Sequence, residues 1–371
     1  MDKRKIILFT VLSWVIVLAA VNFICGRIVG NRYIALDVAD GDLSKKIPGY
    51  FKPDQDKIIL FPGLKEYRVK TNALGFRSVG SFDNSTLNSL TGQYKILALG
   101  DSMTFGLYIG DKDTYPYILQ ESLNREDKNA IVLNAGIGST TIADHIYYLN
   151  KKGLALHPDL VIINFCPNDL EELTGWKGPL YEKMIRENSF SPVKTVKLAN
   201  FMRVFRKMEL AYRYKRWLRK TKDDRTRSIL TAGSKKLDDV LYVAAHQYSP
   251  EVIADPYQES LKAAWDKYFK AVDEIDDLLK KNNIKFLFFI YPEINTVFDA
   301  APKGNYQDIL TAHFKKKKID YIDLRPIFKK HRQDYLKLYN DPPRDYHLSR
   351  YGNSLLVEQI ESYLRNVYKN F

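Results

Sequence analysis

The chain has 371 residues, enough for one large domain or two smaller ones with a sizeable core. Hydrophobic residues make up 45% of it and charged residues 27%, a balance that excludes a disordered chain. The formal net charge of +13, from 57 Lys and Arg against 44 Asp and Glu, favours anionic surroundings such as lipid head groups, acidic glycans or nucleic acid.

The N-terminal segment predicts a membrane-spanning helix. Ile6 to Cys25 is a run without charges, about 30 Å long as a helix, which matches the apolar thickness of a bilayer. A basic cluster at positions 3–5 precedes the run, whereas aspartates dilute the basic residues that follow it. We therefore expect residues 1–26 to form a cytoplasmic tip and a single-pass anchor, with the remainder of the chain outside the cell membrane, in the periplasm or at the cell surface.

Two other interpretations of this segment are weaker. A cleaved signal peptide is disfavoured because the apolar run exceeds the usual length and no A-x-A-like site follows it. A lipoprotein attached through Cys25 is disfavoured by the bulky Phe23 and Ile24 that precede the cysteine. An uncleaved anchor is the interpretation that we retain.

Behind a stalk and lead-in predicted for residues 27–93, apolar runs alternate with helix-like stretches. The predicted strands are 95–99, 130–133, 160–165, 284–291 and 319–324, and the predicted helices are 115–123, 141–152, 257–282 and 349–368. This alternation predicts an α/β fold for residues 94–371, a three-layer α/β/α sandwich with a central parallel sheet. Ligands of such sheets bind at the carboxyl ends of the strands. We therefore expect the candidate catalytic residues at the carboxyl ends of these strands.

Two segments outside this alternation also stand out. Within the lead-in, residues 72–77 (Asn-Ala-Leu-Gly-Phe-Arg) are rich in turn-forming residues. Between the third and fourth strands lies a helical insertion, about 171–283, whose section 198–222 predicts a strongly basic amphipathic helix. That helix fits an anionic membrane surface, but it fits equally a solvated helix that packs on the domain by its apolar side. Both interpretations stay open.

A Gly-Asp-Ser tripeptide that ends at Ser102 follows the first predicted strand directly. A serine at the tip of a parallel strand that opens a helix exposes its hydroxyl above the sheet, and its backbone N–H can serve an oxyanion. A serine hydroxyl needs a base at neutral pH, and His347, ahead of the closing helix, is the candidate. Asp345 is the candidate acid that fixes the tautomer of the imidazole, with Asp341 as the fallback.

Four segments in this order resemble the blocks of the SGNH (GDSL) hydrolases and cover about residues 94–365. The segments are 100–106 (GDSMTFG), 134–140 (NAGIGST), 166–169 (CPND) and 345–349 (DYHLS). The resemblance implies a flavodoxin-like sandwich and a serine nucleophile. Many members space the last block D-x-x-H, whereas this chain has D-x-H, which is similar to a variant found among membrane-tethered members.

The resemblance also implies an oxyanion hole made by the Ser102 N–H, a backbone N–H of the second block and the side-chain amide of Asn168. The commonest family pattern places a glycine where this chain has Ser139. Either Gly138 takes the role, or Ser139 fills it with its own backbone N–H. The third block begins with Cys166 where most members have glycine. This difference leaves the side-chain amide of Asn168 in place.

These residues predict acyl transfer through an acyl-serine intermediate. Water as the acceptor gives a serine esterase, and a sugar hydroxyl gives an O-acyltransferase. The anchor and the resemblance to envelope-associated members imply that the substrates are O-acyl groups of an extracytoplasmic polysaccharide or lipid, and they leave room for a membrane-bound acyl-transfer partner.

Three other function classes compete with this prediction. A catalytically degenerate domain that serves as a binding subunit of a membrane-associated envelope assembly is suggested by Cys166 and Ser139, but the nucleophile, base and acid candidates are all present. Nucleic-acid binding has no motif behind it and does not suit the predicted compartment. A metal site or a cofactor is not expected, because no cluster of ligands has metal-binding spacing and the phosphate-cradling glycine loops are absent.

Overall fold

The computed structural model describes residues 2–29, 32–33, 36, 48–59, 65–78, 91–138, 140–167, 169–170, 223–247, 255–300 and 304–367. The basic section 198–222 of the insertion lies outside the described residues, as do the oxyanion-hole candidates Ser139 and Asn168.

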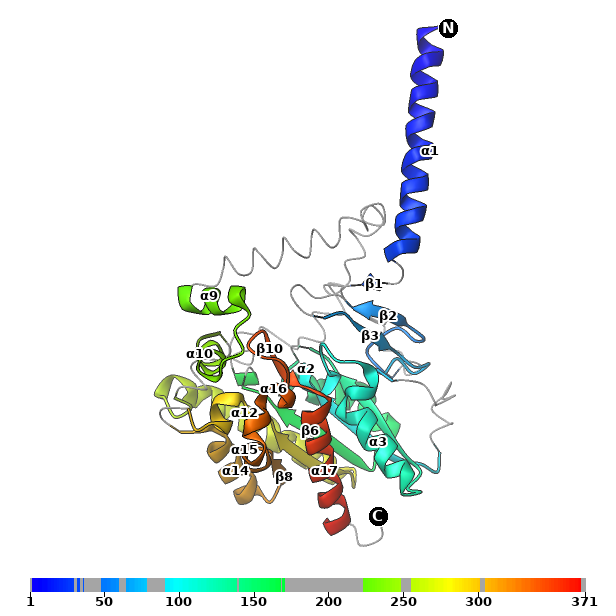
Figure 1. The fold of residues 1–371 in the computed structure, drawn as a ribbon. Coiled ribbons are helices and arrows are strands. Elements are labelled where there is room, and N and C mark those ends of the chain that lie inside the picture. The colour runs from blue at the N-terminus through cyan, green and yellow to red at the C-terminus, as the bar shows by residue number, and fades with distance from the viewer. Residues whose placement is uncertain are drawn as a thin grey trace.

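A five-stranded parallel sheet forms the centre of the domain (Figure 1). Its strand order is β5-β4-β6-β7-β8, and every neighbouring pair is parallel. The strands are β4 (Tyr94–Gly100), β5 (Ala130–Gly136), β6 (Leu160–Phe165), β7 (Lys285–Ile290) and β8 (Asp320–Asp323). The winding direction reverses at β4, the position where open α/β sheets place their ligands. The predicted α/β fold with a central parallel sheet is confirmed.

The central strands are apolar on both faces because helices cover both. Val161 and Ile163 of β6 belong to one buried cluster, whereas the intervening Ile162 belongs to the cluster on the other face, together with Ala98 of β4. Side chains of a strand alternate between the two faces of its sheet, so a doubly covered strand needs a continuous apolar run. The run 160–165 meets that requirement, and it was predicted as a strand because it is a continuous apolar run.

Helices contribute to both apolar clusters. Those in the first include α4 (Ile142–Tyr148), α12 (Glu259–Lys281) and α14 (Tyr306–Lys317), and those in the second include α3 (Tyr115–Arg125) and α17 (Arg350–Val367). The predicted helix 141–152 is shorter than expected. Helix α4 ends at Tyr148, and the chain continues as a π-turn (Leu149–Gly153) and a 3₁₀ turn (Leu154–Leu156).

The remaining elements of the described residues are mostly short. They are α1 (Lys3–Val29), β1 (Arg32–Tyr33), β2 (Asp56–Ile59), β3 (Tyr67–Lys70), α2 (Ser102–Phe105), α9 (Asp224–Ala232), α10 (Leu237–Gln247), α13 (Ile294–Val297), α15 (Arg325–Lys330), α16 (Tyr335–Leu338), β9 (Tyr339–Asp341) and β10 (Asp345–Leu348), with 3₁₀ turns at Asp111–Asp113 and Arg332–Asp334. The last two strands form an antiparallel hairpin that the sequence did not predict.

The described part of the lead-in contributes to the core of the domain. Strands β1, β2 and β3 form a small separate sheet. Residues of the lead-in share a buried cluster with the central sheet, among them Tyr50, Phe51, Tyr67, Val69, Leu74 and Phe76. The Tyr148 hydroxyl donates to the Pro48 carbonyl at 2.7 Å, and the buried Lys152 ammonium donates to the Gly49 carbonyl at 3.0 Å. These contacts attach the described residues of 48–78 to the sheet, to α4 and to the π-turn after it.

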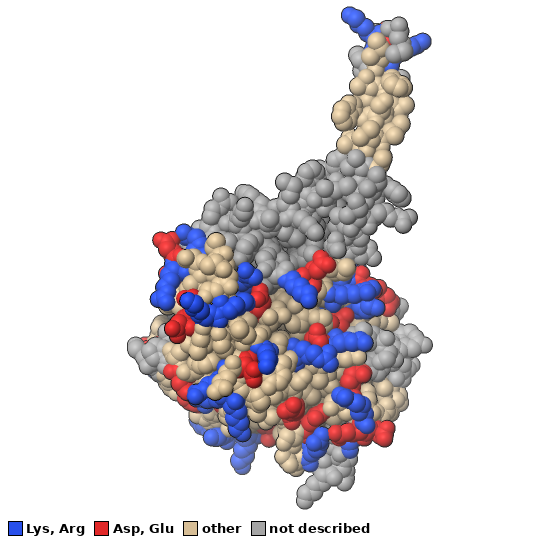
Figure 2. All heavy atoms as spheres, viewed as in Figure 1, with Lys and Arg blue, Asp and Glu red and all other residues tan. Residues whose placement is uncertain are grey.

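Helix α1 projects away from the domain (Figure 1) and exposes apolar side chains such as Phe9 and Trp14. Figure 2 shows basic residues at its far end, and on the visible face of the domain it shows basic and acidic residues interspersed. Among the described residues, no helix combines the length and the apolar composition that crossing a membrane requires. The anchor at residues 1–26 stays a prediction.

Candidate active site

Ser102 opens α2 directly after β4, at the carboxyl edge of the sheet. The Asp101 carboxylate caps this helix by accepting the Met103 N–H at 2.9 Å. The helix ends after one turn because Gly106 adopts a left-handed conformation (φ 78°), and its N–H donates to the Ser102 carbonyl. The short strand-to-helix turn leaves Ser102 half-buried at the tip of β4, where the sequence predicted it.

The β9–β10 hairpin brings His347 and Asp345 to this serine. His347 Nε2 lies 2.7 Å from Ser102 Oγ, and His347 Nδ1 lies 2.5 Å from Asp345 Oδ1. The imidazole therefore bridges the hydroxyl and a carboxylate that is only 3% exposed. The structure brings the three predicted residues together in the arrangement of a Ser-His-Asp triad.

Contacts on both sides hold β10 in place. The second oxygen of Asp345 accepts the side-chain amide of Asn340, across the hairpin, at 2.9 Å. The Tyr291 hydroxyl, beyond the end of β7, donates to the carbonyl of Tyr346. Asp345 is thereby oriented by one partner residue on each oxygen, and Tyr346, which directly precedes His347, is fixed by Tyr291.

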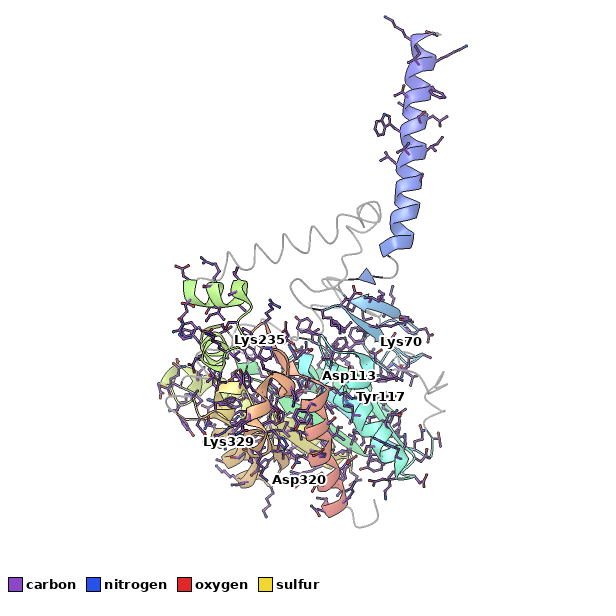
Figure 3. All side chains as sticks on the ribbon, in the orientation of Figure 1. Lys70, Asp113, Tyr117, Lys235, Asp320 and Lys329 are labelled. Carbon is purple, nitrogen blue, oxygen red and sulfur yellow. The ribbon has the colours of Figure 1, made fainter. Side chains whose placement is uncertain are left out.

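The fallback acid Asp341 has other partners. Its carboxylate pairs with Lys235 (Figure 3) and lies 3.5 Å from Arg344 Nη1. No hydrogen bond joins it to His347 in the described part of the chain. Asp345, rather than Asp341, is therefore the carboxylate that contacts His347.

The electrostatics of the site favour the protonated imidazole. Burial by itself would lower the pKa of His347, but the charge and hydrogen bond of Asp345, with a further contribution from the Asp101 charge, outweigh burial and raise that pKa above its ordinary value. Burial also raises the pKa of Asp101, against the hydrogen bonds that its carboxylate accepts from Met103 and Asn164.

The structure places Gly138 beside the nucleophile. A Cβ built on this glycine would lie 3.9 Å from the Ser102 Cβ. Within the described residues, neither the Ser102 N–H nor the Gly138 N–H donates to a protein acceptor, so both remain available for an oxyanion. The alternative donor Ser139 and the amide of Asn168 lie outside the described residues.

One polar residue beneath the nucleophile, Asn164, was missed by the sequence analysis. Asn164 of β6 donates from Nδ2 to Asp101 Oδ1 at 3.1 Å and accepts the Thr104 hydroxyl at 2.8 Å. These bonds connect β6 to Asp101, directly before Ser102, and to Thr104, within α2. The signal was present: Asn164 is the one polar residue in the run 160–165, and a buried polar side chain needs partners.

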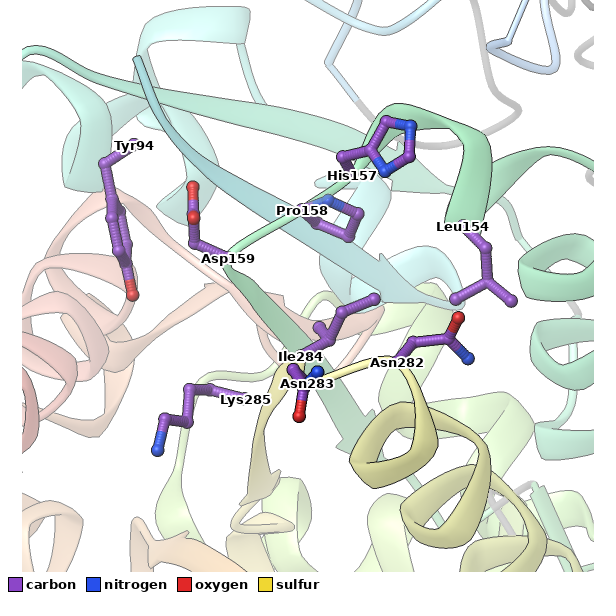
Figure 4. Close-up of a pocket in the computed structure, with 9 residues that line it drawn as sticks. All are labelled: Tyr94, Leu154, His157, Pro158, Asp159, Asn282, Asn283, Ile284 and Lys285. Atoms are coloured by element: carbon purple, nitrogen blue, oxygen red, sulfur yellow. The ribbon is translucent and has the colours of Figure 1, made fainter. Parts of the chain in front are cut away.

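A hollow of about 440 Å³ lies at the opposite edge of the sheet (Figure 4). Its lining includes residues at or near the amino ends of β4, β6 and β7, and consists of Tyr94, Leu154, His157, Pro158, Asp159, Asn282, Asn283, Ile284 and Lys285. It contains none of the triad residues. Among the described residues, no group of three or more His, Cys, Asp or Glu side chains is placed to hold a metal ion.

Comparisons with known proteins place this geometry in a family. The model of the GDSL-like Lipase/Acylhydrolase family matches residues 98–355. Three similar solved structures are the acetyl xylan esterase AlAXEase (18% identity, covering 73% of this chain and 99% of that one, TM-score 0.41), TesA (13%, 73% and 98%, 0.40) and a catalytic mutant of Axe2, an acetylxylan esterase from Geobacillus stearothermophilus (15%, 75% and 95%, 0.41). A search of the curated proteins found no match. The family match spans well over half of the sequence and includes all three triad residues, so the chain belongs to the GDSL-like lipase/acylhydrolase family.

Proposed function

We propose that the protein is a serine esterase or O-acyltransferase that works through an acyl-serine intermediate. The observation that carries this proposal is the continuous contact from Asp345 through His347 to Ser102. In the first half-reaction, His347 Nε2 takes the proton of Ser102 Oγ as this oxygen forms a bond to the ester carbonyl carbon. The imidazolium then returns the proton to the leaving alcohol as the carbon–oxygen bond of the substrate breaks.

In the second half-reaction the acyl group leaves the serine. His347 deprotonates water or a sugar hydroxyl, which attacks the acyl carbonyl carbon, and the proton goes back to Ser102 Oγ as the acyl–serine bond breaks. The negative charge on the carbonyl oxygen in both steps would be stabilised by the N–H groups of Ser102 and Gly138, or of Ser139 in its place, and by the amide of Asn168. Hydrolase and transferase share everything except the acceptor.

The proposed substrates are O-acyl groups of an extracytoplasmic polysaccharide or lipid. Three features support this proposal: the predicted outward-facing anchor, the net charge of +13 and the resemblance of the sequence blocks to membrane-tethered family members. If the protein is a transferase, a membrane-bound partner would supply the acyl group.

The acceptor can be tested with the purified full-length chain. p-Nitrophenyl esters of increasing acyl length report which acyl group is accepted, and O-acetylated oligosaccharides report whether a glycan ester is cleaved. Adding a non-acylated oligosaccharide then separates the two activities, because a transferase forms acylated acceptor whereas an esterase releases free acid only. Failure of every ester to react with a folded protein would contradict the proposal.

The proposed base gives ester hydrolysis a defined pH dependence. Only neutral His347 can accept the serine proton, and its raised pKa keeps the imidazole protonated to higher pH than usual. We expect kcat/KM to fall as the pH falls through a midpoint above the ordinary histidine value of about 6.5. A pH profile of p-nitrophenyl acetate hydrolysis, corrected with Ser102→Ala, measures the midpoint. A midpoint below the ordinary value would contradict the assignment.

We also propose that α1 anchors the protein in the cell membrane with the hydrolase domain outside. The full-length chain is then expected to remain in the membrane pellet after alkaline carbonate extraction. Arginines in place of Val15 and Leu18 are expected to release it, since a charge at the centre of a bilayer costs about 2.5–3.5 kcal/mol. Glu358→Arg, on an exposed position of α17, is the control and should stay in the pellet. Release of the unaltered chain by carbonate would exclude the anchor.

A further inference from the structure

The turn-rich segment 72–77 folds into a tight turn that delivers one arginine to the interior. The Asn72 side-chain oxygen accepts the backbone N–H groups of Leu74 and Phe76, both at 3.0 Å. This side-chain-to-backbone turn lets the chain reverse and enter the domain. Arg77, the last residue of the segment, is only 3% exposed.

The Arg77 guanidinium binds the end of the nucleophile helix and the loop that follows it. Nη1 donates to the carbonyls of Phe105 (2.6 Å) and Gly106 (2.5 Å), and Nη2 donates to the carbonyl of Ile109 (2.7 Å). Nε donates to the Asp111 carboxylate at 2.8 Å, an ion pair that is buried on both sides. A single planar group thus fixes three backbone carbonyls between the end of α2 and the start of the next turn.

The backbone of Arg77 reaches the second sequence block as well. It forms an antiparallel bridge with Asn134, near the end of β5. This end of β5 touches the nucleophile helix closely, because a Cβ on Gly136 would lie 2.2 Å from the Phe105 backbone nitrogen. Arg77 therefore contacts both the segment that begins with Ser102 and the strand that leads to Gly138.

The loop fixed by Arg77 carries Tyr108, and Tyr108 contacts the base. Its ring lies edge-on to the His347 imidazole, with the ring centres 5.3 Å apart and an interplanar angle of 85°. Tyr108 has a left-handed backbone (φ 65°), which is unfavourable for a bulky residue and persists only when its surroundings enforce it. The surroundings include the ring of Tyr67, from the lead-in sheet, which lies edge-on to the Tyr108 ring with the ring centres 6.1 Å apart.

We propose that Arg77 is a positioning residue of the active site. It fixes the end of α2, the helix that begins at Ser102, and holds Tyr108 against His347. This inference rests on the proposed function. It also gives the lead-in a role, because β3, on which Lys70 is labelled in Figure 3, supports the same arrangement. The Lys70 backbone N–H donates to the second oxygen of Asp111 at 3.0 Å. A lysine retains the charge of Arg77 but offers no planar fork, so it cannot bind the three carbonyls and Asp111 together.

The test compares Arg77→Lys, Tyr108→Asn and Arg68→Gln in the full-length chain. kcat and KM for p-nitrophenyl acetate are measured across the neutral pH range, with thermal unfolding of each variant. Asparagine removes the ring and tolerates the left-handed backbone, while the bonds of Arg77 remain. Arg68, on β3 of the lead-in sheet, makes an exposed ion pair with Asp56 and is the matched control.

Arg77→Lys is expected to lower kcat by about 10²-fold with little change in KM, since small displacements of reacting groups have effects of that size. Its pH midpoint should move upward, because burial lowers the pKa of His347 and a displaced Tyr108 uncovers the imidazole. Tyr108→Asn should shift the midpoint in the same direction, and Arg68→Gln should change neither quantity. A loss of stability alone would not move the pH midpoint of the folded enzyme.

The outcomes separate this inference from the proposed function. If the unaltered chain is active and Arg77→Lys has the same kcat and the same pH midpoint as the unaltered chain, the inference is overturned and the proposed function stands. If Arg77→Lys does not unfold cooperatively, the variant is not folded and Tyr108→Asn becomes the test. An unshifted pH midpoint in Tyr108→Asn then overturns the inference. A folded but inactive unaltered chain overturns both.

Discussion

Replacing Ser102 by alanine is expected to reduce ester hydrolysis by about 10⁶-fold, the loss that follows when the nucleophile of a catalytic triad is removed. The reason is that no acyl-serine can form, so the two half-reactions cannot be separated. The residual rate would come from binding and oxyanion stabilisation alone. kcat for the best p-nitrophenyl ester, measured on the folded variant, tests this expectation.

The matched control is Ser354→Ala. Ser354 lies on α17, where its hydroxyl donates to the carbonyl of Arg350 within the same helix. Its loss should leave kcat unchanged and cost little stability. If Ser102→Ala keeps a rate within tenfold of the unaltered chain, the hydrolysis must proceed without an acyl-serine, and the mechanism proposed above is wrong.

Asp345→Asn is expected to lower kcat by about 10⁴-fold while the protein remains folded, the loss seen when the acid of a Ser-His-Asp triad becomes an amide. The carboxylate accepts the proton of His347 Nδ1, which leaves Nε2 free to accept the serine proton. An amide nitrogen facing Nδ1 would favour the other tautomer and would not stabilise the imidazolium. The pKa of His347 should fall in this variant, because Asp345 is the principal group that raises it.

Asp341→Asn distinguishes the triad acid from the other carboxylate of the hairpin. Asp341 pairs with Lys235 and Arg344 rather than with His347, so its amide should have little effect on kcat and a modest effect on stability. A comparable loss of kcat in both variants would show that the hairpin, rather than one carboxylate, is what the reaction requires.

Much of the central fold could be predicted because its signals are local. The strands β4, β6 and β7 are continuous apolar runs, and such runs identify strands that are covered on both faces. The β9–β10 hairpin offered no such signal: its strands are three and four residues long, and a Pro342-Pro343 pair separates them. Its position is determined by contacts with Tyr291 and Lys235, which are distant in sequence.

The burial of the lead-in was not predictable for a similar reason. Its apolar residues, such as Tyr50, Phe51 and Val69, are scattered among polar ones, and the segment was predicted as a stalk and lead-in. Their burial depends on a surface that is created by the central sheet and α4, which follow later in the chain.

The candidate site divides in the same way. Ser102, Asp345 and His347 could be predicted because each lies at a strand end or before the closing helix, where residue type and position together indicate the chemistry. Arg77 could not be assigned a role, since its partners are three carbonyls and a carboxylate 28 to 34 positions away in the sequence. Positioning residues are recognised by what they contact, and those contacts exist only in the folded chain.

The competing proposal is a degenerate domain that binds but does not catalyse. The family departures at Ser139 and Cys166 favour it, and the 2.7 Å contact between His347 Nε2 and Ser102 Oγ argues against it. The two proposals differ in a single chemical property, the reactivity of one serine hydroxyl. An unactivated serine does not react with a fluorophosphonate, whereas an activated nucleophile forms a stable phosphonyl adduct.

The most direct test is therefore to treat the detergent-purified full-length chain with a serine-directed fluorophosphonate and to locate the adduct by mass spectrometry of its peptides. We predict one adduct, on Ser102, which is lost in Ser102→Ala and strongly slowed in His347→Ala. A folded chain without an adduct, or with an adduct on a different serine, would contradict the assignment of Ser102 as an activated nucleophile.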